Sequence, residues 1–161
     1  MLPVELFYII LAVCCLYAAI WGGAPERIGS VIFVSAAILT TAALSAPAAR
    51  WGAVEIRAFA VDIAMLFALF ALAIFAERLW PLWVTALQLI GAAGHAVKLV
   101  DAEVIREAYA FAMAFWSYPM LSLLVFGTWN HQRRLARFGV DKSWSSSSGR
   151  SGMRPPTGPI G

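Results

Sequence analysis

The chain alternates long apolar runs with short links that contain proline, glycine or charged residues. Each apolar run is about 20 residues long, the length that an α-helix needs to cross about 30 Å of hydrocarbon. The pattern therefore predicts an all-α integral membrane bundle of five transmembrane helices. We expect this domain to span residues 1–139, with helices at about 4–21, 28–46, 57–76, 80–100 and 108–129.

Prolines mark special places in the fourth and fifth runs. Pro81 lies between Trp80 and Trp83 at the start of the fourth run. Proline is tolerated in the first turn of a helix, and tryptophans gather at membrane–water interfaces. We therefore expect both tryptophans to anchor this helix at the interface. Pro119 lies within the fifth run and is expected to kink it, because proline removes one backbone hydrogen bond.

The composition indicates in which environment the chain folds and which partners it is suited to. Hydrophobic residues make up 61% and charged residues 13% of it, whereas soluble domains are nearer half and a quarter. The expected partner is therefore the lipid bilayer. The net charge is +3, but six of the twelve lysines and arginines follow Trp129, so this charge does not indicate a nucleic-acid partner. Residues 140–161 are rich in serine, glycine and proline and are predicted to form a disordered tail.

The basic residues also predict how the chain lies in the membrane. Five crossings put the two ends on opposite sides, and cytoplasmic segments carry an excess of lysine and arginine. The basic run after the fifth helix should therefore be cytoplasmic, with the N-terminus outside. On this topology eight basic residues lie inside and four outside, but without the tail the counts are two and four. The predicted orientation thus depends on the tail.

Three ionisable residues lie inside apolar sequence: Asp62 in the third helix, and His95 and Lys98 in the fourth. A charge inside a bilayer is costly, so such residues usually face protein or water and find partners. Antiparallel packing of the two helices would bring the three together in the outer part of the membrane. One interpretation is a polar site for a proton, an ion or a lipid headgroup. The favoured interpretation is structural: Asp62 pairs with Lys98 and fixes the helix register, and His95 is a packing residue.

Two acidic–basic pairs, Glu26 with Arg27 and Glu77 with Arg78, fall in links predicted to be cytoplasmic. They can pair across the two helical hairpins, or they can be solvated separately in their turns. We favour solvation, because charged residues in short links are usually exposed to water.

The sequence argues against several kinds of catalytic or cofactor site. The two histidines, His95 and His131, lie on opposite sides of the predicted bilayer, so one subunit cannot use both to bind a haem. Ligand clusters for a di-iron centre, a G-x-S-x-G motif, a P-loop and a dinucleotide-binding turn are all missing from the sequence. We therefore assign no catalytic, cofactor-binding or metal-binding residue. Cys14 and Cys15 are adjacent in an apolar helix and are read as small apolar side chains.

Three short segments resemble a known group of proteins. They are residues 24–27 (APER), 77–83 (ERLWPLW) and 127–131 (GTWNH). With the arrangement of apolar runs around them, up to about Arg137, they are similar to short uncharacterised polytopic inner-membrane proteins of alphaproteobacteria. The resemblance implies a bacterial inner membrane and a five-helix bundle, and it implies nothing chemical.

These features lead to one functional hypothesis and two alternatives. The first is a non-catalytic membrane protein, an accessory or assembly component that acts through helix packing in a homo-oligomer or a larger membrane complex. Small residues spaced four apart in the second helix favour close helix contacts. The first alternative is a small transporter or ion-conducting oligomer that uses Asp62, His95 and Lys98. A lipid-modifying enzyme is the second alternative, although the sequence nominates no nucleophile for it.

Overall fold

The computed structural model describes residues 4–45, 51–100, 106–139, 141 and 144. Within these helices the structure describes the backbone alone for residues 4, 44–45, 51–55, 95–100 and 106–115. The described part of the chain is all-α, as predicted, and its only β-type contact is an isolated bridge between Ala76 and Trp144. Its helices are α1 (Val4–Trp21), α2 (Ala24–Ser45), α3 (Trp51–Phe75), α4 (Trp80–Val100) and α5 (Arg106–Phe138).

Two helices contain stretches that are long and apolar enough to cross a membrane. These stretches are Ala24–Ala43 in α2 and Ile56–Phe75 in α3, each 20 residues long. A shorter apolar segment, Glu5–Trp21, forms most of α1. In the described residues, therefore, two spanning candidates are found, and the prediction of five transmembrane helices is not confirmed.

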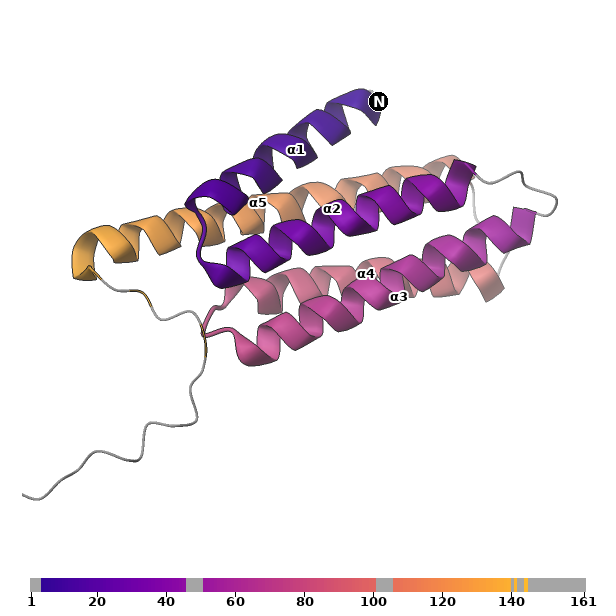
Figure 1. The fold of residues 1–161 in the computed structure, drawn as a ribbon. Helices are drawn as coiled ribbons and strands as arrows, with labels where there is room; N and C mark the ends of the chain where they lie inside the picture. The colour runs from indigo at the N-terminus through magenta and orange to yellow at the C-terminus, as the bar shows by residue number, and fades with distance from the viewer. Residues whose placement is uncertain (1–3, 46–50, 101–105, 140, 142–143, 145–161) are drawn as a thin grey trace, which may run out of the picture.

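The five helices form a closed ring of contacts (Figure 1). Each helix packs against the next one in the chain, and α5 packs against both α4 and α1. A weaker contact of α5 with α2 crosses the ring. The side chains that fill the centre come from all five helices and, with Ala76, from the α3–α4 connection: Leu11, Cys15, Ala18, Phe33, Leu69, Leu72, Ala76, Trp80, Val84, Met120, Leu121 and Leu124.

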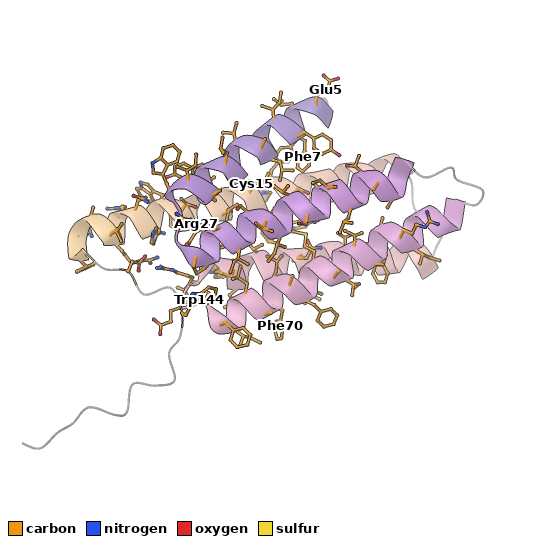
Figure 2. All side chains as sticks on the ribbon, in the orientation of Figure 1. Glu5, Phe7, Cys15, Arg27, Phe70 and Trp144 are labelled. Atoms are coloured by element: carbon orange, nitrogen blue, oxygen red, sulfur yellow. The ribbon has the colours of Figure 1, made fainter. Side chains whose placement is uncertain are left out.

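Large apolar side chains also cover the outside of the bundle. Phe70 on α3 points away from the other helices and is 53% exposed (Figure 2). Val13 on α1 and Val31 on α2 are exposed to a similar degree, 62% and 64%. A surface on which large apolar groups are this common is suited to lipid or to another apolar helix surface.

The helix bounds differ from the expected ones mainly where polar residues join a helix. α2 begins at Ala24 instead of 28, because Pro25 and Glu26 suit the first turn of a helix. α5 is 33 residues long and ends at Phe138 instead of 129, so the basic run is part of this helix. It continues as a helix through Pro119. Figure 1 shows the C-terminal end of α5 extending beyond the α1–α2 and α3–α4 connections.

Gly139 ends α5 and turns the chain back toward the bundle. Its φ of 71° is the left-handed conformation that glycine adopts without a steric penalty, and its amide donates to the carbonyl of Leu135 at 2.9 Å. Beyond it, Asp141 reaches side chains of α3–α4 and α5, and Trp144 bridges Ala76. Asp141 and Trp144, which fall in the predicted disordered tail, therefore contact the folded bundle, whereas residues 140, 142–143 and 145–161 of that tail lie outside the described residues.

Candidate functional site

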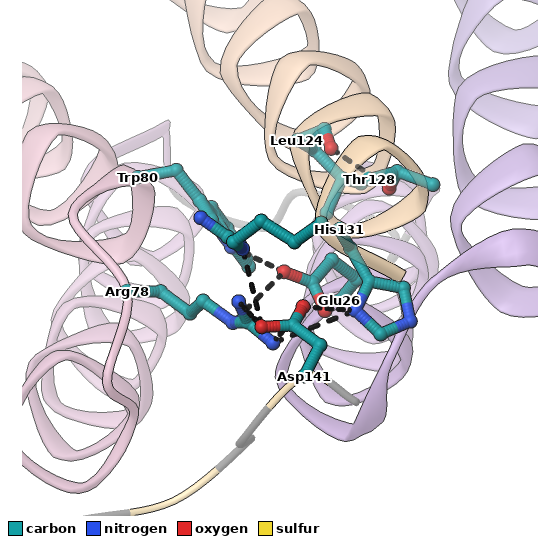
Figure 3. Close-up of polar contacts among 8 residues, drawn as sticks. Glu26, Arg78, Trp80, Leu124, Thr128, His131 and Asp141 are labelled. Carbon is teal, nitrogen blue, oxygen red and sulfur yellow. Dashed lines mark hydrogen bonds and ion pairs between the residues drawn. The ribbon is translucent and has the colours of Figure 1, made fainter. Parts of the chain in front are cut away.

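Charged side chains from four segments meet at the end of the bundle where α1 connects to α2 and α3 to α4 (Figure 3). We call this group the ionic cluster; it consists of Glu26, Arg78, His131, Arg134 and Asp141. The exposed fractions of the side chains are 0% for Glu26, 2% for Arg78, 7% for Asp141 and 10% for His131. Arg134, at 41%, forms the rim. Charges this well buried are costly unless they are paired.

Arg78 holds the centre of the ionic cluster between two carboxylates. Its Nη1 donates to Asp141 Oδ1 at 2.8 Å, and its Nη2 lies 2.6 Å from Asp141 Oδ2. This is a two-pronged pairing of guanidinium and carboxylate, the strongest geometry available to such a pair. On its other side, Arg78 Nε lies 3.8 Å from Glu26 Oε1, which is an ion pair without a hydrogen bond.

Asp141 accepts further hydrogen bonds from α5. Arg134 Nε donates to Oδ1 at 3.1 Å, and His131 Nδ1 lies 2.6 Å from Oδ2. Because a carboxylate can only accept, this imidazole nitrogen carries the hydrogen. The 3.5 Å separation between His131 Nδ1 and Arg78 Nη2 is therefore a contact of two donors. The four donors to Asp141 fill the acceptor positions of its carboxylate.

The surroundings of Asp141 change its pKa in two opposing ways. Burial raises the pKa, but hydrogen bonds from Arg78 and His131 and the charges of Arg78 and Arg134 lower it more, to about 2. The ordinary value is 3.8. Asp141 is therefore ionised at neutral pH, and its negative charge is part of what holds the ionic cluster together.

Glu26 links the ionic cluster to the apolar core through Trp80. The indole Nε1 of Trp80 donates to Glu26 Oε1 at 2.9 Å. The ring lies where α2 and α5 present glycines: a Cβ added at Gly29 would lie 2.6 Å from Cη2, and one at Gly127 would lie 2.5 Å from Cδ1. Both distances are too short for real atoms, so these glycines make room for the indole.

This placement corrects the expectation that both tryptophans near Pro81 are interfacial anchors. Trp80 is 5% exposed and packs in the core, whereas Trp83 is 62% exposed. The two residues are three apart on α4, but the first faces the glycines of α2 and α5 and the second faces outward. The sequence shows the tryptophans but not the two glycines that form the recess.

Gly23 brings the α1–α2 connection close to α5. A Cβ at this position would lie 2.9 Å from His131 Cε1 and 3.0 Å from Glu26 Oε2. Within the described residues, Glu26 Oε2 and Arg78 Nε are buried and lack a hydrogen-bond partner. The tight packing at Gly23 explains why Glu26 Oε2 has little room for one.

The two acidic–basic pairs of the links behave differently from the favoured interpretation. Glu26 and Arg78 pair across the hairpins and are buried, so separate solvation is wrong for them. Arg27 and Glu77, by contrast, are exposed. One member of each pair points into the bundle because the helix start and the α3–α4 connection fix the directions of neighbouring side chains about 100° or more apart.

Asp62 lies on the α3 surface that faces α4, as predicted for a partner of that helix. The side-chain amide of Gln88 donates to both the backbone oxygen and Oδ1 of Asp62, each at 3.2 Å. The side chains of His95 and Lys98 lie outside the part of the chain that the structure describes. Gln88 precedes His95 by seven residues, about 10 Å along a helix. The predicted grouping of Asp62, His95 and Lys98 stays a prediction.

Sequence reasoning missed most of the ionic cluster. The sequence places His131 and Arg134 in a basic run and Asp141 in the tail, and it assigns none of them to a site. One signal was present: Asp141 is the only acidic residue after Glu107, in a segment with six basic residues. A single acid among so many bases is a candidate for specific pairing.

The arrangement is suited to holding segments together. Among the residues with described side chains, no group of three or more histidine, cysteine or acidic residues is placed to hold a metal ion. The donors and acceptors of the ionic cluster come from α2, the α3–α4 connection, α5 and Asp141, and they are mostly directed at one another. Comparison with models of known protein families, with curated proteins and with solved structures finds no match for this chain.

Proposed function

We propose that the protein is a non-catalytic integral membrane protein, an accessory or assembly component that acts through helix packing. The observation that carries this proposal is the separation of charge from apolar surface. The charged groups of the ionic cluster face one another, and large apolar side chains cover the outside of the helices. What the molecule offers to other molecules along its helices is therefore mainly an apolar surface.

In this proposal all five helices cross the bacterial inner membrane, with the N-terminus outside and the C-terminal end of α5 in the cytoplasm. The arrangement at the ionic cluster supports the proposed sidedness. The α1–α2 connection, the α3–α4 connection and the basic end of α5 lie at one end of the bundle, and Arg133 and Arg137 there are exposed. A basic end of this kind is expected on the cytoplasmic side.

A labelling experiment tests the sidedness. Glu77 is exposed in the α3–α4 connection, so Glu77→Cys gives a reactive thiol there. We expect a membrane-impermeant maleimide to label it in inverted vesicles and not in intact spheroplasts. The unchanged protein, which has only Cys14 and Cys15 within α1, measures the background. Labelling in spheroplasts alone would reverse the proposed orientation.

The outward face of α2 is the proposed contact surface. Val31, Ser35, Ile38 and Ala42 are exposed at spacings of three and four residues, so they form one stripe. The small side chains of Ser35 and Ala42 let another helix approach closely in lipid. The pair Ala37 and Thr41 has a different role: Ala37 packs against the core, and the Thr41 hydroxyl is 2.8 Å from that of Tyr8 on α1.

Native mass spectrometry of the full chain, extracted gently from its own membrane, tests the function. We expect a fixed stoichiometry with a second polypeptide or with further copies of the chain. Ala42→Trp should break the complex, while Ala12→Trp, the same change at an exposed alanine on α1, should leave it intact. A monomer in every preparation would contradict the proposal. An oligomer whose ion flux in vesicles is abolished by Asp62→Asn would favour the transporter instead.

A further inference from the structure

Asp141 is held in a manner that is unusual for a residue outside the helices. Its carboxylate receives hydrogen bonds or ion pairs from three side chains, those of Arg78, His131 and Arg134. These donors come from two elements separated in sequence, so their convergence is a property of the folded bundle. The carboxylate of Asp141 reaches these donors from the segment that follows Gly139.

The three donor side chains form a binding site that is mostly buried and has one exposed edge. The side chains of Arg78 and His131 are at least nine-tenths buried, and they form its inner wall. Arg134 is 41% exposed and forms the outer edge. A guanidinium that presents two parallel N–H groups matches a carboxylate and a phosphate group equally well.

The charges of the neighbouring side chains indicate which kind of ligand the site would bind if Asp141 were displaced. Arg78 and Arg134 carry two positive charges, and Glu26 opposes them with one negative charge at 3.8 Å from Arg78 Nε. One positive charge then remains unbalanced, and a proton on the second nitrogen of His131 would add another. An anion of charge −1 or −2 balances this set. When Asp141 is displaced, Glu26 still pairs with Arg78, so the inner wall of the site does not depend on Asp141 alone.

We propose that Arg78, His131 and Arg134 form a binding site for a phosphate group, which Asp141 occupies from within the same chain. The carboxylate acts as an internal competitor, because its attachment to the chain gives it a high effective concentration at the site. A phosphate group displaces it by offering the same donors more oxygens and more charge. The proposal goes beyond helix packing and does not depend on it.

The phosphate group has two possible sources, a soluble phosphate and the headgroup of a lipid. The surroundings of the site suit a lipid when the bundle lies in a membrane. Trp83 is exposed on α4, and Arg133 stacks on Trp129 with its Cζ 4.5 Å from the ring centroid. Such aromatic and basic groups lie at the depth of lipid headgroups. The experiment therefore has one arm for each source.

The test compares phosphate binding with and without the internal carboxylate. The full chain is purified in phosphate-free detergent solution and titrated calorimetrically with sodium phosphate, and separately with dihexanoyl phosphatidic acid. We expect Asp141→Ala to bind at least one of the two probes ten or more times more tightly than the unchanged protein. Tighter binding of sodium phosphate indicates a soluble phosphate. Tighter binding of phosphatidic acid alone, with none of dihexanoylglycerol, indicates a lipid phosphate.

Matched variants show whether the binding is at this site. In the Asp141→Ala protein, Arg134→Ala should lower the affinity at least tenfold, whereas Arg137→Ala, at an exposed arginine three residues further along α5, should leave it unchanged within twofold. Should Asp141→Ala fail to fold, Asp141→Asn keeps the shape and removes the charge, and the same comparison applies. A folded variant that gains no affinity for either probe overturns the proposal, as does equal loss from Arg137→Ala and Arg134→Ala.

Discussion

The protein pairs polar groups in two regions, and it does so differently in each. At the ionic cluster, Asp141 is bound by three cationic or imidazole side chains at distances of 2.6–3.1 Å. Between α3 and α4, the side-chain amide of Gln88 donates to the backbone oxygen and to Oδ1 of Asp62, each at 3.2 Å. The first region joins several segments at the end of the bundle, and the second joins two neighbouring helices along their length. The difference indicates that long-range order depends on the end of the bundle, and local register on its middle.

Removing the central arginine of the ionic cluster should lower the stability of the bundle more than any other change proposed here. Arg78→Ala leaves Glu26 and Asp141 without their shared cation, and losing one partner of a buried ion pair costs about 3–5 kcal/mol. We expect the free energy of unfolding in mixed detergent–SDS micelles to fall by that amount. Arg27→Ala, which removes an exposed arginine at the same end, should change it by less than about 0.5 kcal/mol. Equal effects would show that burial at this end contributes nothing.

Filling the recess for Trp80 tests the connection between the ionic cluster and the core. Gly127→Ala places a methyl group 2.5 Å from the indole Cδ1, and overpacking of this kind costs up to about 3 kcal/mol. The near-ultraviolet circular dichroism of the tryptophans should change as well. Gly91→Ala is the control, since an added Cβ there has no atom within 4 Å. It should leave stability unchanged or raise it slightly, by about 0.5–1 kcal/mol.

The low pKa of Asp141 predicts that the ionic cluster makes the stability of the protein depend on pH. The pKa is about 2 in the folded protein and near 3.8 in the unfolded chain, so the unfolded state takes up the proton first as the pH falls. The resulting stability, about 2 kcal/mol, is complete above about pH 5 and is lost as the pH falls from about 4 to 2. Thermal unfolding of the Asp141→Asn protein should lack this loss. A difference between the two proteins that stays constant down to pH 2 would contradict it.

Changing the middle of the bundle should have the smallest effect. Gln88→Leu removes the hydrogen bonds to Asp62 and keeps the size of the side chain. Hydrogen bonds between membrane helices contribute about 0.6 kcal/mol on average, so we expect a loss near that value in the same micelle assay. A loss as large as that of Arg78→Ala would show that the Asp62–Gln88 contact contributes as much to stability as the ionic cluster does.

The sequence predicts the helices far better than the groups that hold them together. The apolar runs indicate helices because their length and composition leave few alternatives, and α1 and α4 begin and end where expected. Polar residues at helix ends were harder to assign: Glu26 and the basic run after Trp129 were expected in links and lie on α2 and α5. A charged residue beside an apolar run fits a link and a helix end equally well.

The ionic cluster itself needed three-dimensional information. The pairing of Glu26 with Arg78 was one of two alternatives, and the choice depended on how the two hairpins pack. The site of Asp141 depended on the turn at Gly139, whose left-handed conformation redirects the chain. No spacing rule along the sequence connects Asp141 with Arg78, which lies 63 residues before it. Of the predicted intramembrane group, only Asp62 is described with its side chain, and it accepts a hydrogen bond from Gln88.

The long separations within the ionic cluster have a consequence for biosynthesis. Glu26 precedes Trp80 by 54 residues, and Arg78 precedes Asp141 by 63, so the last component is made well after the first hairpin has left the ribosome. Until then Glu26 of α2 is the carboxylate partner of Arg78, and Asp141 is not yet present to join the α3–α4 connection to α5. A chain that stops short of Asp141 keeps unpaired charges where the finished protein buries them.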